Sequence, residues 1–221
     1  GVRLDLVTDS PVVELDVLLT HIRVNLQPYR PAAFDVLVDG ELVASVATLD
    51  GHKVHLSTFD RSIDLDAGEP TTIRLADLPT AGGARVEIWL PQGTGLALAA
   101  VRVADGAHVA PGEVGGARRW VHHGSSISHG AEADQPTGTW PAVAARLAGV
   151  DLQSLAFAGQ CMLDPFVART IRDLPADLIS VKAGINVVNG DTMRERTFVP
   201  ALHGFLDTIR DGHPTTPLLV A

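Results

Sequence analysis

The sequence predicts an α/β fold in two parts, an antiparallel β-sandwich followed by a layered domain on a parallel sheet. Residues 1–104 contain short runs of Val, Leu, Ile and Thr, with turn residues between many of them and no helical pattern. Residues 105–119 contain four glycines and Pro111, which is typical of a linker. Within residues 120–221, strands alternate with helices, and such βαβ units require a parallel sheet with right-handed crossovers.

The N-terminal part is expected to form a jelly-roll-like sandwich of about 100 residues, because its short strands follow one another at the spacing of sandwich domains. Asp39-Gly40 lies between two of these runs and predicts a type I′ hairpin, since both residues tolerate positive φ. The expected strands are 3–7, 12–20, 22–27, 34–38, 42–48, 54–58, 71–75, 84–90 and 96–103.

The C-terminal part is expected to contain three helices. The first runs from Trp140 to Leu147, with Pro141 in its first turn and Gly149 after its end. Asp164-Pro165 caps the second, over 166–173. The third covers about residues 195–211, where Pro200 is tolerable only if it lies in the first turn.

The end of this third helix contains an Asp and a His, in Asp211-Gly212-His213-Pro214. We interpret it as a helix stop, with Gly212 in the left-handed C′ position and His213 near the negative end of the helix dipole. The apolar run 217–221 that follows is expected to be a buried strand of the parallel sheet.

Composition excludes several classes of function. The net charge of −9 and the absence of a Lys or Arg run argue against a nucleic-acid partner. No apolar run is long enough to span a bilayer, so no membrane partner is expected. The single cysteine, Cys161, rules out an internal disulfide framework, and we expect a cytoplasmic protein rather than a secreted one. Composition does not predict the oligomeric state.

Residues 122–130, His-His-Gly-Ser-Ser-Ile-Ser-His-Gly, place a hydroxyl directly after an apolar strand. Reactive groups of open α/β sheets lie at the carboxyl ends of the strands, which makes Ser126 a candidate nucleophile. The alternative is an ordinary polar loop, since Ser and Gly are common in loops. Two later segments favour the first interpretation: the next apolar run ends at Gly159, and the run after that is followed by Gly184 and Asn186.

A serine, a glycine and an asparagine in this order resemble blocks I, II and III of the SGNH, or GDSL-type, hydrolase family. The resemblance covers about residues 120–221 and implies a flavodoxin-like three-layer SGNH hydrolase domain. It implies that Ser126 is the nucleophile, and that the Ser126 N–H, the Gly159 N–H and the Asn186 amide form the oxyanion hole. Such donors meet the negative charge of the tetrahedral intermediate, and losing one typically costs about 10²–10³ in rate.

Two departures from the family pattern stand out. The family usually has Gly-Asp-Ser at block I, where this chain has Gly124-Ser125-Ser126. Its block V, an Asp-x-x-His that supplies the general base, is absent after Asn186. We therefore expect the catalytic His and Asp to lie outside these residues, in a longer polypeptide whose SGNH domain is incomplete here.

The histidines around Ser126 raise the alternative of a metal site. His122 and His123 are adjacent on a strand and so point to opposite faces, and no acidic neighbour completes a zinc set with His129. We expect no metal and no organic cofactor. A lone cysteine near a strand end, such as Cys161, is interpreted as a small buried filler.

The sequence thus predicts a serine-dependent hydrolase (esterase or acylhydrolase) that acts on a small-molecule or carbohydrate ester through an acyl-enzyme. Two alternatives stay open. The same residues would serve an acyltransferase that uses an alcohol in place of water. The second alternative, which the missing block V suggests, is a non-catalytic carbohydrate-binding protein with a vestigial serine site.

Overall fold

The computed structural model describes residues 2–112 and 116–221. These residues form two compact units, each of which is described by itself. One unit contains residues 2–112 together with residues 132–137, and the other contains residues 116–131 and 138–221. Of the expected linker 105–119, residues 113–115 lie outside the described residues, while 109–111 form a strand and 119 begins another.

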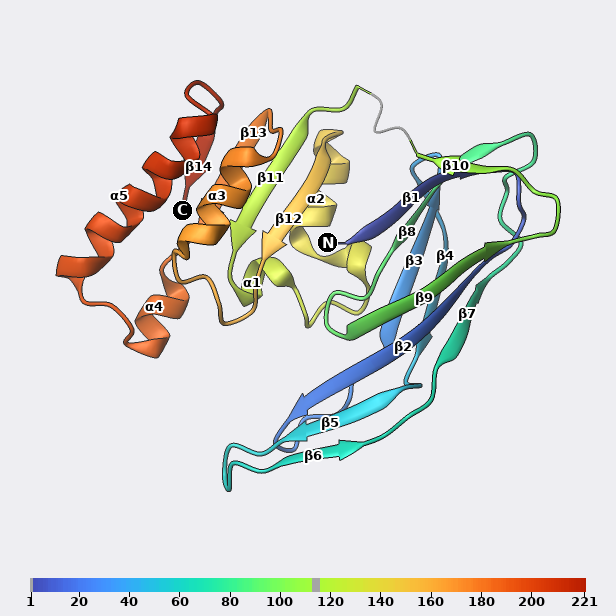
Figure 1. Cartoon of the computed structure of the whole chain (residues 1–221), viewed down its shortest axis with the longest axis horizontal. Coiled ribbons are helices and arrows are strands. Elements are labelled where there is room, and N and C mark those ends of the chain that lie inside the picture. Colours follow the sequence, from blue (N-terminus) through green and yellow to red (C-terminus); the bar gives the residue numbers. More distant parts are fainter. Residues whose placement is uncertain (1, 113–115) are drawn as a thin grey trace. The chain divides into compact units, whose positions relative to one another are not determined.

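The first unit consists of two sheets, whose strands are labelled in Figure 1. The inner side chains of the two sheets share one hydrophobic core. Strand β2 alternates buried and less buried residues along its length, with Val13, Leu15, Val17 and Leu19 facing inward. One sheet has the order β10-β1-β8-β3-β4, and β6-β5-β2-β7 with β9 beside β2 form the other. The strands are β1 (Arg3–Thr8), β2 (Val13–Val24), β3 (Ala32–Val38), β4 (Glu41–Thr48), β5 (His52–Leu56), β6 (Ile63–Asp66), β7 (Thr71–Leu75), β8 (Ala84–Trp89), β9 (Gly95–Val103) and β10 (Val109–Pro111).

The hairpin prediction is confirmed, because Asp39 and Gly40 have φ of 48° and 88° between β3 and β4. Three other expectations were wrong. The runs 12–20 and 22–27 form one strand, β2, because His21 continues the inward row. Strand β2 pairs with β5 in parallel, so the unit is not wholly antiparallel. Strands β6 and β10 were not expected, since each is short and exposed and lacks a strong apolar pattern.

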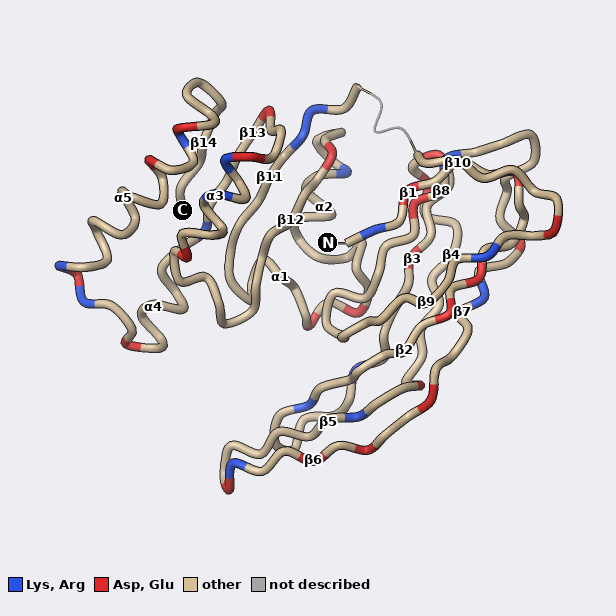
Figure 2. Tube along the Cα trace, in the orientation of Figure 1, with Lys and Arg blue, Asp and Glu red and all other residues tan. Residues whose placement is uncertain are grey.

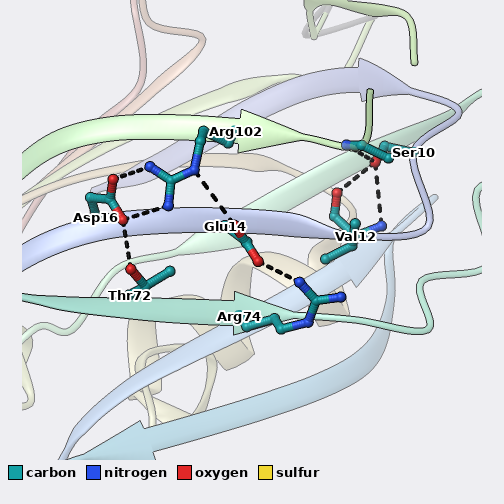
Figure 3. A network of polar contacts seen from close by, with 8 residues as sticks. Ser10, Val12, Glu14, Asp16, Thr72, Arg74 and Arg102 are labelled. Carbon is teal, nitrogen blue, oxygen red and sulfur yellow. Dashed lines mark hydrogen bonds and ion pairs between the residues drawn. The ribbon is translucent and has the colours of Figure 1, made fainter. Parts of the chain in front are cut away.

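The outer face of β2, β7 and β9 carries charged residues in place of apolar ones (Figure 3). Asp16 binds the Arg102 guanidinium and accepts a 2.7 Å hydrogen bond from Thr72. Glu14 pairs with Arg74 and lies 3.5 Å from Arg102. These pairs cross neighbouring strands, and they lower the pKa of Asp16 to about 2, chiefly through the Arg102 hydrogen bond.

The second unit is built on a parallel sheet with the order β12-β11-β13-β14. In chain order this is 2-1-3-4, the strand order of flavodoxin-like sheets. The sequence expectation of a parallel sheet in an α/β domain is therefore confirmed. Its elements are β11 (Arg119–Gly124), α1 (Ser126–His129), α2 (Trp140–Ala148), β12 (Asp151–Ala156), α3 (Pro165–Asp173), β13 (Leu178–Lys182), α4 (Ile185–Gly190), α5 (Glu195–Gly212) and β14 (Leu218–Val220), and a 3₁₀ turn covers Pro136–Gly138.

Helices cover both faces of this sheet (Figure 1). On one face, α3 and α5 pack on the central strands, and Ile171 and Ile209 meet Ile179 and Val181 in a buried core. On the other face, α2 packs on β12, and the Trp140 ring lies 5.1 Å from His122 and 6.1 Å from Trp120. Alternate residues of β11 thus face different layers.

Two expectations about the last helix were wrong. Gly212 does not take the left-handed C′ position, because α5 continues through it. A Cβ there would stand 2.2 Å from the Arg172 carbonyl oxygen, so Gly212 allows α5 to approach α3 closely. Pro200 lies inside α5, beyond its first turn, at an exposed position of a helix held by its buried Phe205 and Ile209.

The C-terminal run pairs with β13 in parallel, as expected for a strand of this sheet. It is not buried, however, since Leu219 is 62% exposed and Val220 is 40% exposed. Among the described residues, β14 is an edge strand of this sheet. No helix in the described part of the chain is long and apolar enough to cross a membrane.

Candidate active site

The register of the parallel sheet brings the three motif segments to one edge. Gly124, the last residue of β11, pairs with Ala156 of β12 and with Lys182 of β13. The three strands therefore end at the same level. Ser126, Gly159 and Asn186 follow those ends by only a few residues, on adjacent strands. In open α/β sheets ligands bind at this carboxyl edge, and the 2-1-3 order makes it the point where the strand order reverses.

Ser126 is the first residue of α1, and its side chain is exposed at the end of a buried strand. The carbonyl of Ser125 accepts from the N–H groups of Ser128 and His129 and so closes the turn. The N–H of a first helical residue has no acceptor inside the helix, so the Ser126 N–H is available to a ligand. Ser125, which stands where the family has Asp, is fully buried, and its Oγ has no partner among the described residues.

Gly159 lies in a turn closed by the Gln160 N–H, which donates 3.1 Å to the Phe157 carbonyl. Its φ of 72° is positive and that of Ala158 is not, as in a type II turn, where the third position favours glycine. The residue is exposed. The Phe157 N–H donates 2.9 Å to the Gly124 carbonyl, which extends the β11–β12 ladder up to this turn.

Asn186 is half-buried near the start of α4, just after β13. Its Oδ1 accepts a 3.0 Å hydrogen bond from the Cys161 N–H. A second hydrogen bond joins the same loop to α1, because the Ala158 N–H donates 3.2 Å to His129 Nδ1. Hydrogen bonds therefore join all three segments. The loop after β12, which carries Gly159, is bonded to α1 on one side and to α4 on the other.

His122 and His123 point to opposite faces of the sheet, as expected. His122 Nδ1 lies 2.7 Å from Ser180 Oγ, which also accepts 2.7 Å from Trp120 Nε1. Burial lowers the pKa of His122 to about 4, with a smaller contribution from the neighbouring His123. His122 Nε2 and Ser128 Oγ are buried without partners among the described residues. This cluster lies beneath the Ser126 turn, because a Cβ on Gly124 would meet both atoms within 3.3 Å.

On the other face, His123 Nε2 lies 3.3 Å from Cys161 Sγ. Burial lowers the pKa of His123 and raises the pKa of the Cys161 thiol to about 11. The thiol is therefore protonated at neutral pH and is not a nucleophile. His213, which the sequence places after the last helix, is buried at the end of α5, and its Nε2 lies 3.0 Å from the Ile171 carbonyl oxygen.

Sequence reasoning missed the connections of three residues. His129 was considered only as a weak metal candidate, and Cys161 only as a filler. Ser180 was not considered at all. Spacing gives a signal for Cys161, which follows Gly159 by two residues, but none for Ser180, whose partners lie about 60 residues earlier. In the part of the chain that the structure describes, no group of three His, Cys, Asp or Glu residues is placed to hold a metal ion.

The GDSL-like lipase/acylhydrolase family matches residues 117–221. The salicylyl-acyltransferase SsfX3 from a tetracycline biosynthetic pathway is similar over 98% of this chain, with 38% sequence identity and a TM-score of 0.79. This chain spans 57% of that protein's length. No curated protein matches the sequence.

Carbohydrate esterases share the fold. A family two carbohydrate esterase from Clostridium thermocellum, in complex with cellohexaose, has 11% identity and a TM-score of 0.68, over 100% of this chain and 70% of that one. Another, from Cellvibrio japonicus, has 17% identity and a TM-score of 0.61, over 100% and 69%. At these identities the similarity concerns the fold alone.

Proposed function

Because residues 117–221 match the GDSL-like lipase/acylhydrolase family, we propose that this chain carries a serine site that hydrolyses carboxylic esters through an acyl-enzyme. The observation that carries the proposal is the common level at which β11, β12 and β13 end. It brings an exposed hydroxyl, a glycine N–H and an amide side chain to one edge of the sheet. The hydroxyl supplies a nucleophile, and a backbone N–H and a side-chain amide are donors of the kinds that form oxyanion holes.

In the proposed reaction, Ser126 Oγ attacks the ester carbonyl carbon while a general base takes its proton. The carbonyl oxygen becomes an oxyanion, which the N–H groups of Ser126 and Gly159 and the amide of Asn186 stabilise. The intermediate collapses, the base returns its proton to the leaving alcohol, and the acyl group stays on Ser126. Water then attacks the acyl-serine with the help of the same base and releases the carboxylic acid.

We propose that the base is a histidine from outside these 221 residues, as the sequence suggests. His122 and His123 do not fit the role, because both are buried and hydrogen-bonded beneath the site. His213 does not fit it either, since it is held at the far end of α5 by the Ile171 carbonyl. No metal or organic cofactor takes part in the proposed reaction.

The substrate that we propose is an uncharged ester of a small molecule or a carbohydrate. Residues 125–131, 157–163 and 183–190, which follow the three strands, contain no Asp, Glu, Lys or Arg, and Figure 2 shows the turns after β11 and β12 without charge. Ile127, Phe157 and Ile185 of these segments are 54%, 42% and 40% exposed. An uncharged, partly apolar rim favours a neutral acyl group over a phosphorylated or strongly ionic one.

We also propose that the first unit is a jelly-roll-like β-sandwich. Its two sheets share one core, which supports this description. Carbohydrate binding by this unit is part of the same proposal, and it rests on likeness of shape alone. Trp89 does not support it, because this residue is only 4% exposed and cannot serve as a platform for a sugar.

Transfer of the acyl group to an alcohol is a second candidate function, favoured by the 38% identity with an acyltransferase. The two functions share every residue named above and differ in what attacks the acyl-serine. Incubation with an activated ester, with and without a candidate acceptor alcohol, separates them. Free acid as the main product in both cases supports hydrolysis, whereas an acceptor ester formed faster than free acid supports transfer.

The direct test is intact-mass spectrometry of the natural polypeptide after treatment with a fluorophosphonate probe, beside a Ser126→Ala variant. We expect one adduct on the natural protein and none on the variant. A natural protein that stays unlabelled and shows no esterase activity would favour the non-catalytic alternative. In that case carbohydrate affinity should be the same with and without Ser126→Ala.

A further inference from the structure

The orientation of the Asn186 amide is set by a backbone group. The Cys161 N–H donates 3.0 Å to Asn186 Oδ1. An amide side chain has one accepting end and one donating end, and a backbone N–H can only donate. The contact therefore turns Oδ1 toward the loop after β12 and leaves Nδ2 as the end that can donate to a substrate oxygen. The position of the Cys161 backbone decides which end of the amide faces a ligand.

The Cys161 side chain anchors that backbone. Its Sγ lies 3.3 Å from His123 Nε2 and 3.5 Å from the Lys182 carbonyl oxygen. His123 Nδ1 lies 2.8 Å from the Leu155 carbonyl oxygen, which can only accept, so Nδ1 carries the ring hydrogen and Nε2 is the nitrogen that accepts from the thiol. The thiol and the imidazole thus join the ends of β11, β12 and β13 beneath the candidate site.

Both groups hold the protonation states that this contact needs. Burial raises the pKa of the Cys161 thiol to about 11, so the thiol keeps its hydrogen at neutral pH. Burial lowers the pKa of the His123 imidazole, which keeps Nε2 free to accept. The His123 ring also stacks on Phe205 of α5, with centroids 5.7 Å apart and planes at 25°. The ring is therefore held from two sides.

We infer that His123 and Cys161 are positioning residues for the oxyanion hole, which hold the Asn186 amide in its donating orientation without touching the substrate. This inference rests on the proposed function, in which Asn186 stabilises the oxyanion. A shift of about 1 Å in a catalytic group can cost about 100-fold in rate. A buried anchor below the loop is therefore expected to affect the rate of the acyl step.

The first test compares Cys161→Ala with Cys161→Ser in the natural polypeptide, with an activated ester as substrate. Cys161→Ala keeps the backbone N–H but loses the anchor, and we expect kcat to fall about 10-fold or more with little change in KM. Cys161→Ser keeps a hydroxyl that can donate to His123 Nε2, and it should recover most of the rate. Val167→Ala, at a buried core position of α3, is the control: it should lower the melting temperature and leave kcat unchanged.

A double-mutant cycle with Asn186→Ala separates positioning from general damage. Asn186→Ala alone should lower kcat by about 10²–10³. Adding Cys161→Ala should cost nothing more, because the amide that it positions is already gone. Wild-type kcat in Cys161→Ala, or losses that add in the double variant, would overturn this inference while leaving the proposed function intact. Full activity in Ser126→Ala would overturn the proposed function itself.

Discussion

His122 Nδ1 lies 2.7 Å from Ser180 Oγ, and both residues are buried. The same hydroxyl oxygen accepts from Trp120 Nε1. The contact joins β11 to β13 directly beneath the turn that carries Ser126. Burial makes the charged form of His122 costly, and the stability of this unit should therefore depend on pH.

The free energy of unfolding should decrease as the pH falls from about 6.5 to about 4. The pKa of His122 is lowered from 6.5 to about 4 in the folded protein, so the unfolded chain binds more protons in this range. The contribution of neutral His122 to the free energy of unfolding is fully present above pH 6.5, the pKa in the unfolded chain. It decreases as the pH falls toward about 4, the pKa in the folded protein, by up to about 3 kcal/mol in total. Chemical denaturation between pH 4 and 8 measures it. His122→Leu should flatten this slope, and an unchanged slope in that variant would contradict the assignment.

Gly159→Ala should slow the proposed acyl reaction, and its effect on stability should be no larger than that of the same change at a control glycine. An added Cβ meets nothing within 4 Å, but φ of 72° costs an L-residue about 1–2 kcal/mol, so the turn is expected to shift. Gly149→Ala is the matched control, because Gly149 also has open space and φ of 63° at the end of α2. We expect the two variants to lose similar amounts of melting temperature. Only Gly159→Ala should have a kcat that is at least about tenfold lower, because a small displacement of a catalytic group has an effect of this order. Equal kcat in the two variants would argue against a role for Gly159.

Two glycines of α5 should respond to alanine with opposite signs. A Cβ at Gly212 would stand 2.2 Å from the Arg172 carbonyl oxygen, and such overpacking typically costs about 1–3 kcal/mol. Gly204 is exposed in the same helix with nothing within 4 Å, so Gly204→Ala should stabilise by up to about 1 kcal/mol. Thermal unfolding of both variants checks the pair. A stabilising Gly212→Ala would mean that α3 and α5 are not in close contact.

Asp35→Ala should destabilise the two-sheet unit strongly. The carboxylate is fully buried in β3 and accepts from Ser45 Oγ at 2.7 Å, from the Thr137 N–H at 2.9 Å and from Thr137 Oγ1 at 2.6 Å. Its loss leaves buried donors without an acceptor, which should cost about 3 kcal/mol. Asp16→Ala serves as the control, since the Asp16–Arg102 pair is exposed and exposed pairs contribute little. Equal losses in the two variants would contradict this distinction.

The sequence by itself determined most of the longer elements of this protein, although it did not predict the short elements α1, α4, β6 and β10. Alternation of apolar residues, the Asp39-Gly40 turn and the helix starts at Pro141 and Pro165 are local signals, and the structure places the corresponding elements where they were expected. The order of Ser126, Gly159 and Asn186 along the chain was also sufficient to indicate the family that residues 117–221 match. The strand, turn and helix signals depend on residues within one turn or one strand of each other, and the family signal depends on three short motifs and their order along the chain.

Only the tertiary structure decided the features that depend on contacts between residues far apart in the sequence. The parallel pairing of β2 with β5 and the close approach of Gly212 to Arg172 join segments with no local signal for each other. The same holds for the Cys161 N–H, which selects the donating end of the Asn186 amide. Side-chain partners, burial and the resulting pKa shifts arise only when strands come together in register, since each depends on the desolvation and geometry that packing creates.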